Sequence, residues 1–168
     1  MVIWITGLSA SGKTTLSKAF EKKIKATRPN TVLLDGDVIR ELYGNDLGFT
    51  EPDRIVQIKR LQSIASFLEK QSILVVVAAL YANHELLENN RTRFADYFEV
   101  YLKADIEFLM RREFKDLYKN ALANKIDNVV GVSIPWNEPA HPDIVFDVKD
   151  GYTADEMAQK IYALTIGN

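Results

Sequence analysis

The sequence predicts a single α/β domain over residues 1–168, in which helices cover both faces of a five-stranded parallel sheet. Three observations support this fold class. Short apolar segments alternate with longer amphipathic stretches, a glycine-rich loop joins the first segment to a helical pattern, and no proline- or glycine-rich linker divides the chain. Alternating strands and helices are typical of parallel sheets. A helix between two strands brings the chain back to the end of the sheet where the first strand began, so that the second strand runs in the same direction.

Five apolar segments have the length and composition of buried strands. They span residues 2–6, 31–34, 73–79, 98–102 and 144–148. Their aliphatic and β-branched residues mostly follow one another without polar alternation, as in parallel strands that are buried on both faces. Such sheets bind ligands at the carboxyl ends of their strands, so we expect the functional residues there.

Between these strands, apolar residues recur every three or four positions, which predicts amphipathic helices. A first helix is expected over 15–25, directly after the glycine-rich loop. A longer helix follows Thr50, a suitable N-cap, with Pro52 in its first turn. Its apolar residues recur every three or four positions, at Ile55, Ile58, Leu61, Ala65 and Leu68.

Composition excludes several classes of function. The 21 Lys and Arg residues nearly balance the 23 Asp and Glu residues, which argues against nonspecific binding of nucleic acid. The absence of cysteine excludes disulfides, thiolate metal sites and cysteine nucleophiles. The longest apolar run, 73–80, is shorter than the ~20 residues of a membrane span, and the first residues do not resemble a signal peptide. We therefore expect a cytoplasmic protein with no nucleic-acid or membrane partner.

A phosphate-binding motif follows the first predicted strand. Residues 7–14 read GLSASGKT and match the P-loop pattern GxxxxGK[ST] between a strand and a helix. Backbone N–H groups of such a loop bind phosphate oxygens, its lysine reaches the β- and γ-phosphates, and its hydroxyl residue, here Thr14, binds Mg²⁺. The motif predicts the P-loop NTPase fold. The residues expected to bind the donor nucleotide are Gly7, Ser9, Ala10, Ser11, Gly12, Lys13, Thr14 and Thr15.

Two carboxylates follow the second predicted strand, at the same edge of the sheet as the P-loop. Asp35 is suited to hold Mg²⁺ together with Thr14. Asp37 is suited to accept the proton of a hydroxyl group that attacks the γ-phosphate. The same residues are also consistent with a purely structural role, in which Asp35 and Gly36 form a turn that begins a helix. The nearby P-loop favours the functional interpretation.

Three segments resemble the adenylylsulfate (APS) kinase family. They read LLDGDVIRELYGNDLGFTEPDR at 33–54, RREFKDLYKNALANKID at 111–127 and PWNEPAHPD at 135–143. The resemblance covers most of the chain. It implies a kinase that transfers the γ-phosphoryl group of MgATP to the ribose 3′-hydroxyl of a nucleotide with an anionic 5′-anhydride. It also implies a possible homodimer.

The resemblance further implies an acceptor site. It makes Asp37 the base, Arg40 and Arg54 the ligands of the acceptor's anion, and Phe49 the stacking partner of its nucleobase, tasks that suit these residue types. Without the resemblance, a core role for Phe49 and a solvated charge at Arg54 are the better interpretations. The acceptor-binding residues implied are Asp35, Asp37, Arg40, Phe49, Arg54, Gln57, Leu80, Tyr81, Lys115 and Leu117.

Residues 111–135 resemble the mobile lid of the family. A lid excludes water from the transferring phosphoryl group. The resemblance implies that Arg111 and Lys115 neutralise charge at the reacting centre and that Arg112 binds the donor nucleotide. A charged helix face with ordinary ion pairs fits these letters equally well.

The chain departs from the usual family pattern in its acceptor site. Val38 and Gln57 stand where the family has Asn, LYAN at 80–83 replaces ISPY, and VVG at 129–131 replaces FTG. The aliphatic Val129 removes a stacking surface worth about 1–3 kcal/mol per base, which favours a small pyrimidine. The resulting residue pattern resembles that of a capsule-pathway branch of the family, whose members phosphorylate cytidine diphosphoramidate. Adenylylsulfate in sulfate assimilation is the alternative acceptor, with Trp136 or Tyr81 as a replacement stacking partner.

Two interpretations come from other functional classes. Residues 124–127 read NKID, the NKxD motif of GTPases, but in a polar helical stretch and without an upstream DxxG. A nucleotide-binding protein that has lost catalysis is the other. The presence of Lys13, Thr14, Asp35 and Asp37, all needed for phosphoryl transfer, argues against it.

Overall fold

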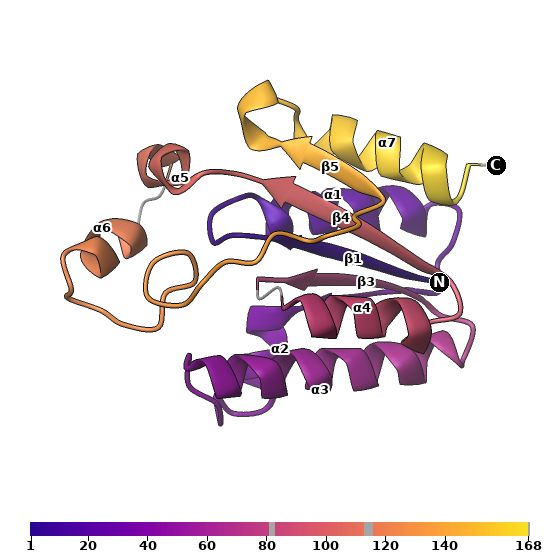
Figure 1. Ribbon diagram of the computed structural model, residues 1–168. Coiled ribbons are helices and arrows are strands. Elements are labelled where there is room, and N and C mark those ends of the chain that lie inside the picture. The colour runs from indigo at the N-terminus through magenta and orange to yellow at the C-terminus, as the bar shows by residue number, and fades with distance from the viewer. Residues whose placement is uncertain (81–82, 113–115, 168) are drawn as a thin grey trace.

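A five-stranded parallel sheet forms the centre of the molecule (Figure 1). The computed structural model describes residues 1–80, 83–112 and 116–167. The strand order is β2-β3-β1-β4-β5, and every pairing is parallel, as the sequence predicts. The strands are β1 (Val2–Gly7), β2 (Thr31–Asp35), β3 (Leu74–Ala79), β4 (Tyr97–Lys103) and β5 (Ile144–Asp147).

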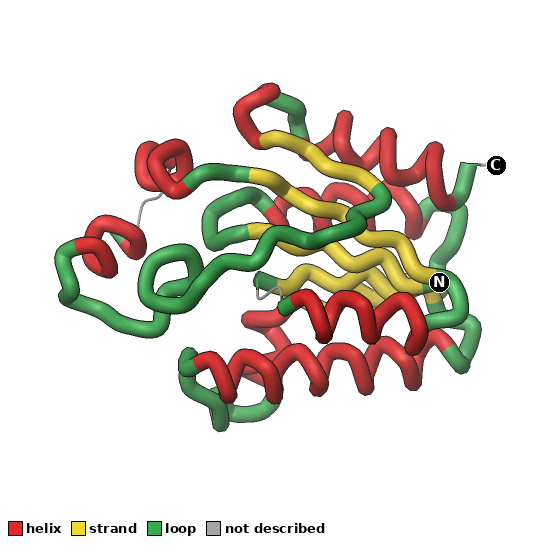
Figure 2. Tube along the Cα trace, viewed as in Figure 1, coloured by secondary structure: helices red, strands yellow, loops and turns green. Residues whose placement is uncertain are grey.

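Helices cover both faces of this sheet (Figure 2). On one face lie α1 (Lys13–Lys25) and α7 (Ala154–Thr165), which pack against each other. On the other lie α3 (Glu51–Glu69) and α4 (His84–Arg93). The short elements are α2 (Gly36–Leu42), α5 (Ile106–Arg112), α6 (Leu117–Leu122) and the 3₁₀ helix η1 (Val148–Asp150).

The central strand β1 supplies residues to two separate cores. Alternate residues of a strand point to opposite faces of the sheet. Ile3 and Ile5 therefore pack with residues of α1 and α7, whereas Trp4 packs with residues of α3 and α4. All six residues of β1 are buried, which fixes the start of the glycine-rich loop that follows.

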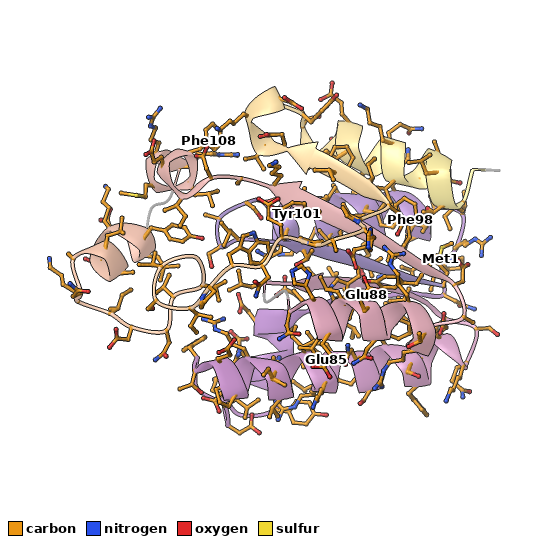
Figure 3. All side chains as sticks on the ribbon, in the orientation of Figure 1. Met1, Glu85, Glu88, Phe98, Tyr101 and Phe108 are labelled. Carbon is orange, nitrogen blue, oxygen red and sulfur yellow. The ribbon has the colours of Figure 1, made fainter. Side chains whose placement is uncertain are left out.

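The functional elements gather at the carboxyl ends of the strands. In Figure 1, α5 and α6 extend beyond this end, and the segment 123–143 returns from α6 to β5 across the side of the sheet that α4 covers. Tyr101 of β4, labelled in Figure 3, contacts Trp136 of that segment with ring centroids 6.1 Å apart. Among the described residues, no helix combines the length and apolar character that a membrane crossing requires.

Candidate active site

The P-loop leads from β1 into the amino end of α1 through residues with positive φ angles. Ala10 and Gly12 have positive φ angles of 62° and 102°. At Gly7 a β-carbon would lie 2.7 Å from the Leu102 carbonyl oxygen, so no side chain fits there. None of the described side chains caps the first turn of α1, which leaves its N–H groups for an anion. The buried Ser11 hydroxyl has no hydrogen-bond partner among the described residues.

Lys13 folds back onto the P-loop. Its Nζ donates hydrogen bonds to the carbonyl oxygens of Gly7, at 2.8 Å, and Leu8, at 2.7 Å. Burial of the ammonium group lowers the pKa of Lys13 from 10.5 to about 8, although the carboxylates of Asp37 and Asp35 partly oppose this change. The Lys13 ammonium group is thus buried with too little nearby negative charge to balance its own. A buried positive charge of this kind favours the binding of phosphate anions.

The lowered pKa of Lys13 predicts that the ligand-free protein becomes more stable as pH rises through the range 8 to 10.5. In this range the unfolded chain binds more protons than the folded chain, so the free energy of unfolding increases with pH. We expect Lys13 to contribute about 1.4 kcal/mol for each pH unit. Urea unfolding of the wild type and Lys13→Met at several pH values measures this contribution as the difference between the two profiles. Parallel profiles would contradict it.

Asp35 links the P-loop to the start of α2. Its Oδ2 accepts a hydrogen bond from Thr14 Oγ1 at 2.8 Å, and its Oδ1 accepts one from the Asp37 backbone N–H at 3.0 Å. Asp35 is therefore the N-cap of α2, as the turn interpretation of the sequence expects, and its contact with Thr14 leaves a role in Mg²⁺ binding as a prediction. Oxygen ligands of this kind are those that Mg²⁺ prefers. The residues of the P-loop and Asp35 thus fit a nucleotide with bound Mg²⁺.

A cavity of about 350 Å³ lies beside the P-loop. The P-loop, α2, α3, the end of β3, α6 and the segment 126–130 all contribute to its wall. Gln57 of α3 donates from Nε2 to the Gly36 carbonyl oxygen at 3.0 Å, which holds α3 against the start of α2. The predicted acceptor-binding residues that line the cavity are Asp37, Arg40, Phe49, Arg54, Gln57, Leu80 and Leu117. Of the others, Asp35 does not line it, and Tyr81 and Lys115 lie outside the described residues.

Two arginines flank the exposed ring of Phe49. The guanidinium carbons of Arg40 and Arg54 lie 4.9 and 5.6 Å from the ring centroid. Arg40 donates to the Gly48 carbonyl oxygen at 2.9 Å. Phe49 is 57% exposed and Arg54 only 8%. The structure therefore contradicts the interpretations of Phe49 as a core residue and of Arg54 as a solvated charge.

The predicted lid residues have different environments. Leu117 lines the cavity, and the buried Tyr118 donates from its hydroxyl to the Ser9 carbonyl oxygen at 3.1 Å. This bond joins α6 to the P-loop. Arg111 and Arg112 are exposed at the end of α5 and do not line the cavity, and the guanidinium of Arg112 lies 5.6 Å from the Phe108 ring centroid.

Sequence reasoning missed three residues of the cavity wall. Ile126, Asp127 and Asn128 line it together with Val129 and Val130. The sequence placed the first two in the NKxD motif at 124–127, which in the structure follows α6 rather than a strand. Their position directly before the altered segment 129–131 is a signal from which they could have been assigned to the acceptor site.

Comparisons with known proteins agree with this geometry. The profile of the adenylylsulphate kinase family matches residues 1–147. A cytidine diphosphoramidate kinase of Campylobacter jejuni is 38% identical over 138 residues, which are 82% of this chain and 81% of the relative. An adenylyl-sulfate kinase of Picosynechococcus is 34% identical over 144 residues, 86% of this chain and 81% of the relative.

A solved structure extends the similarity to the whole fold. The APS kinase of Mycobacterium tuberculosis, in complex with AMPPNP and APS, superposes with a TM-score of 0.87 at 32% identity, and the match covers 97% of this chain and 95% of that one. The parallel sheet, the P-loop and the adjoining cavity are those of an ATP-dependent, Mg²⁺-using phosphotransferase. The chain belongs to the adenylylsulphate kinase family.

Proposed function

We propose that this kinase phosphorylates the ribose 3′-hydroxyl of cytidine diphosphoramidate. The observation that carries the proposal is the composition of the cavity beside the P-loop. It keeps Asp37, Arg40 and Phe49 but has the aliphatic Val129 in its wall, so it offers a nucleobase one aromatic surface among these residues. A single stacking surface suits a pyrimidine better than a purine. The 38% identity with a cytidine diphosphoramidate kinase supports the same acceptor.

Adenylylsulfate is the second candidate acceptor. Relatives named adenylyl-sulfate kinase are about as similar to the chain, and the APS kinase with a TM-score of 0.87 holds APS. Both acceptors are nucleotides with an anionic 5′-anhydride, so the same phosphoryl-transfer residues serve either one. The candidates differ in the base and in the terminal group of the anhydride.

The residues of the proposed site have two kinds of task, which are to position the two substrates and to accept a proton. In this proposal Lys13 of the P-loop binds the oxygens of the transferring phosphoryl group. Asp37, which lines the cavity, accepts the proton of the attacking 3′-hydroxyl. Thr14 and Asp35 would hold Mg²⁺, which neutralises charge on the phosphate oxygens. In this proposal Phe49 stacks on the base, and Arg40 and Arg54, which line the same cavity, bind the acceptor's anion.

A lid over 111–135 completes the proposed site. Tyr118 and Leu117 support it, because one bonds to the P-loop and the other lines the acceptor cavity. An element that contacts donor loop and acceptor cavity together is able to exclude water when both nucleotides are bound. Exclusion of water prevents hydrolysis of ATP in place of transfer.

The acceptor is tested by ADP release with MgATP and each candidate acceptor in turn. Cytidine diphosphoramidate and adenylylsulfate are supplied separately over several decades of concentration, and kcat/KM is compared. A large preference for the cytidine compound supports the proposal. A preference for adenylylsulfate assigns the altered cavity to a sulfate-assimilation enzyme. The absence of turnover with any 5′-modified nucleotide would reject acceptor phosphorylation as the function.

Replacing Phe49 by alanine is expected to raise KM for the acceptor roughly 5- to 150-fold, because the base loses the aromatic ring on which it stacks. The KM for ATP should not change. The ring is exposed at the cavity, so its removal leaves the core intact. Phe67→Ala is the matched control, because Phe67 is similarly exposed on α3 but does not line the cavity. An unchanged acceptor KM in Phe49→Ala would reject the stacking role.

A further inference from the structure

Arg54 joins two walls of the acceptor cavity that are far apart in the sequence. Its Nε donates to the Phe49 carbonyl oxygen at 2.9 Å, and its Nη2 donates to the Asn128 carbonyl oxygen at 2.8 Å. The arginine is buried, so these charge-assisted bonds are shielded from competing water. The segment 126–130 is thereby held beside the stacking residue.

This segment leads into a tight turn that fixes its position further. The Val129 carbonyl oxygen accepts hydrogen bonds from the backbone N–H groups of Val132, Ser133 and Ile134 at 3.0 to 3.1 Å. The Val129 backbone N–H donates to Ser133 Oγ at 2.9 Å. Residues next to this turn are therefore held in place before any ligand binds, which is the condition for selective recognition.

Two acidic residues line the cavity, at two different places in its wall. Asp37 lies at the start of α2, within electrostatic reach of Lys13 and Arg40, where phosphoryl transfer takes place in the proposed function. Asp127 lies on the segment that Arg54 ties to Phe49. Asp127 therefore lines the same cavity as Phe49, and in the proposed function the base that stacks on Phe49 lies in that cavity.

We infer that the Asp127 carboxylate selects an acceptor whose base carries an exocyclic amino group, as cytosine does, over one with a keto group, as in uracil. An ionised carboxylate only accepts hydrogen bonds. The cytosine amino group donates one, as in the pairing of Asp or Glu with cytosine in nucleic-acid recognition, whereas the uracil O4 is itself an acceptor. The inference rests on the proposed function, because it needs a nucleotide in this cavity.

The test uses CDP and UDP, which differ at the base edge but share a 5′-diphosphate. Their dissociation constants are measured by calorimetry with the P-loop saturated by AMPPNP, so that neither probe binds at the donor site. We expect the wild type to bind CDP about tenfold more tightly than UDP, the lower part of the range for a hydrogen bond to a charged group. Asp127→Asn, whose amide both donates and accepts, is expected to remove the preference.

The control is Asp150→Asn, a loss of charge at an exposed residue of η1 outside the cavity, and it should keep the preference. AMPPNP affinity reports on folding in each variant, and Asp127 is exposed, so its replacement spares the core. Equal binding of CDP and UDP by the wild type, or a preference that persists in Asp127→Asn, would overturn the inference alone. Turnover of adenylylsulfate without binding of CDP would overturn the cytidine acceptor and the inference together.

Discussion

Replacing Asp37 by asparagine is expected to lower kcat about 10²- to 10⁴-fold, the usual contribution of a general base. The Asp37 side chain lines the acceptor cavity, and its backbone N–H, which the substitution leaves in place, still bonds to Asp35. The fold of α2 and the Mg²⁺-binding pair of Thr14 and Asp35 are therefore preserved. Steady-state kinetics with a saturating acceptor measure the effect, and calorimetry with AMPPNP is expected to show a modest change in donor affinity.

The comparison requires a control of equal charge change. Glu41→Gln removes a carboxylate from an exposed position on the same helix, outside the cavity, and should leave kcat within about twofold, as surface substitutions usually do. The measurements belong near pH 7, because Asp37 raises the pKa of Lys13, and its loss shifts that lysine toward the neutral form. If Asp37→Asn turns over at the wild-type rate, Asp37 is not the base.

Local sequence patterns predicted the sheet and the P-loop with few errors. Each strand of the structure begins and ends within one residue of its predicted bounds, because runs such as LVVVAA of β3 are short, rich in β-branched residues and buried on both faces. Thr50 caps α3 as expected, since a cap depends on its own helix alone: its side chain accepts from the Asp53 backbone N–H. The lysine and hydroxyl of the P-loop are likewise fixed by one strand, one turn and one helix.

The acceptor cavity was harder to predict because it depends on contacts between distant segments. Arg54 reaches the Asn128 carbonyl oxygen across 74 positions of the chain, and no local pattern at 126–128 indicates that partner. Arg111 and Arg112 illustrate the opposite problem. The sequence around these two arginines is equally consistent with a lid and with a solvated helix. The structure shows that both side chains are exposed and do not line the cavity.

Replacing Lys13 by methionine is expected to lower kcat/KM by at least about 10²- to 10³-fold, the cost of removing one positioned charge donor at the transition state. Methionine keeps an unbranched apolar stem in the half-buried site and removes only the ammonium group that bonds to Gly7 and Leu8.

Lys18→Met on the exposed side of α1 is the matched control for loss of a positive charge. It should retain wild-type kinetics. Urea unfolding at pH 7 separates chemistry from folding, because Lys13→Met relieves the desolvation of a buried cation while it gives up two hydrogen bonds, so its stability is expected to stay near the wild-type value. A stable variant that keeps more than about one tenth of the wild-type kcat/KM would show that the P-loop backbone and Mg²⁺ provide most of the stabilisation without this lysine.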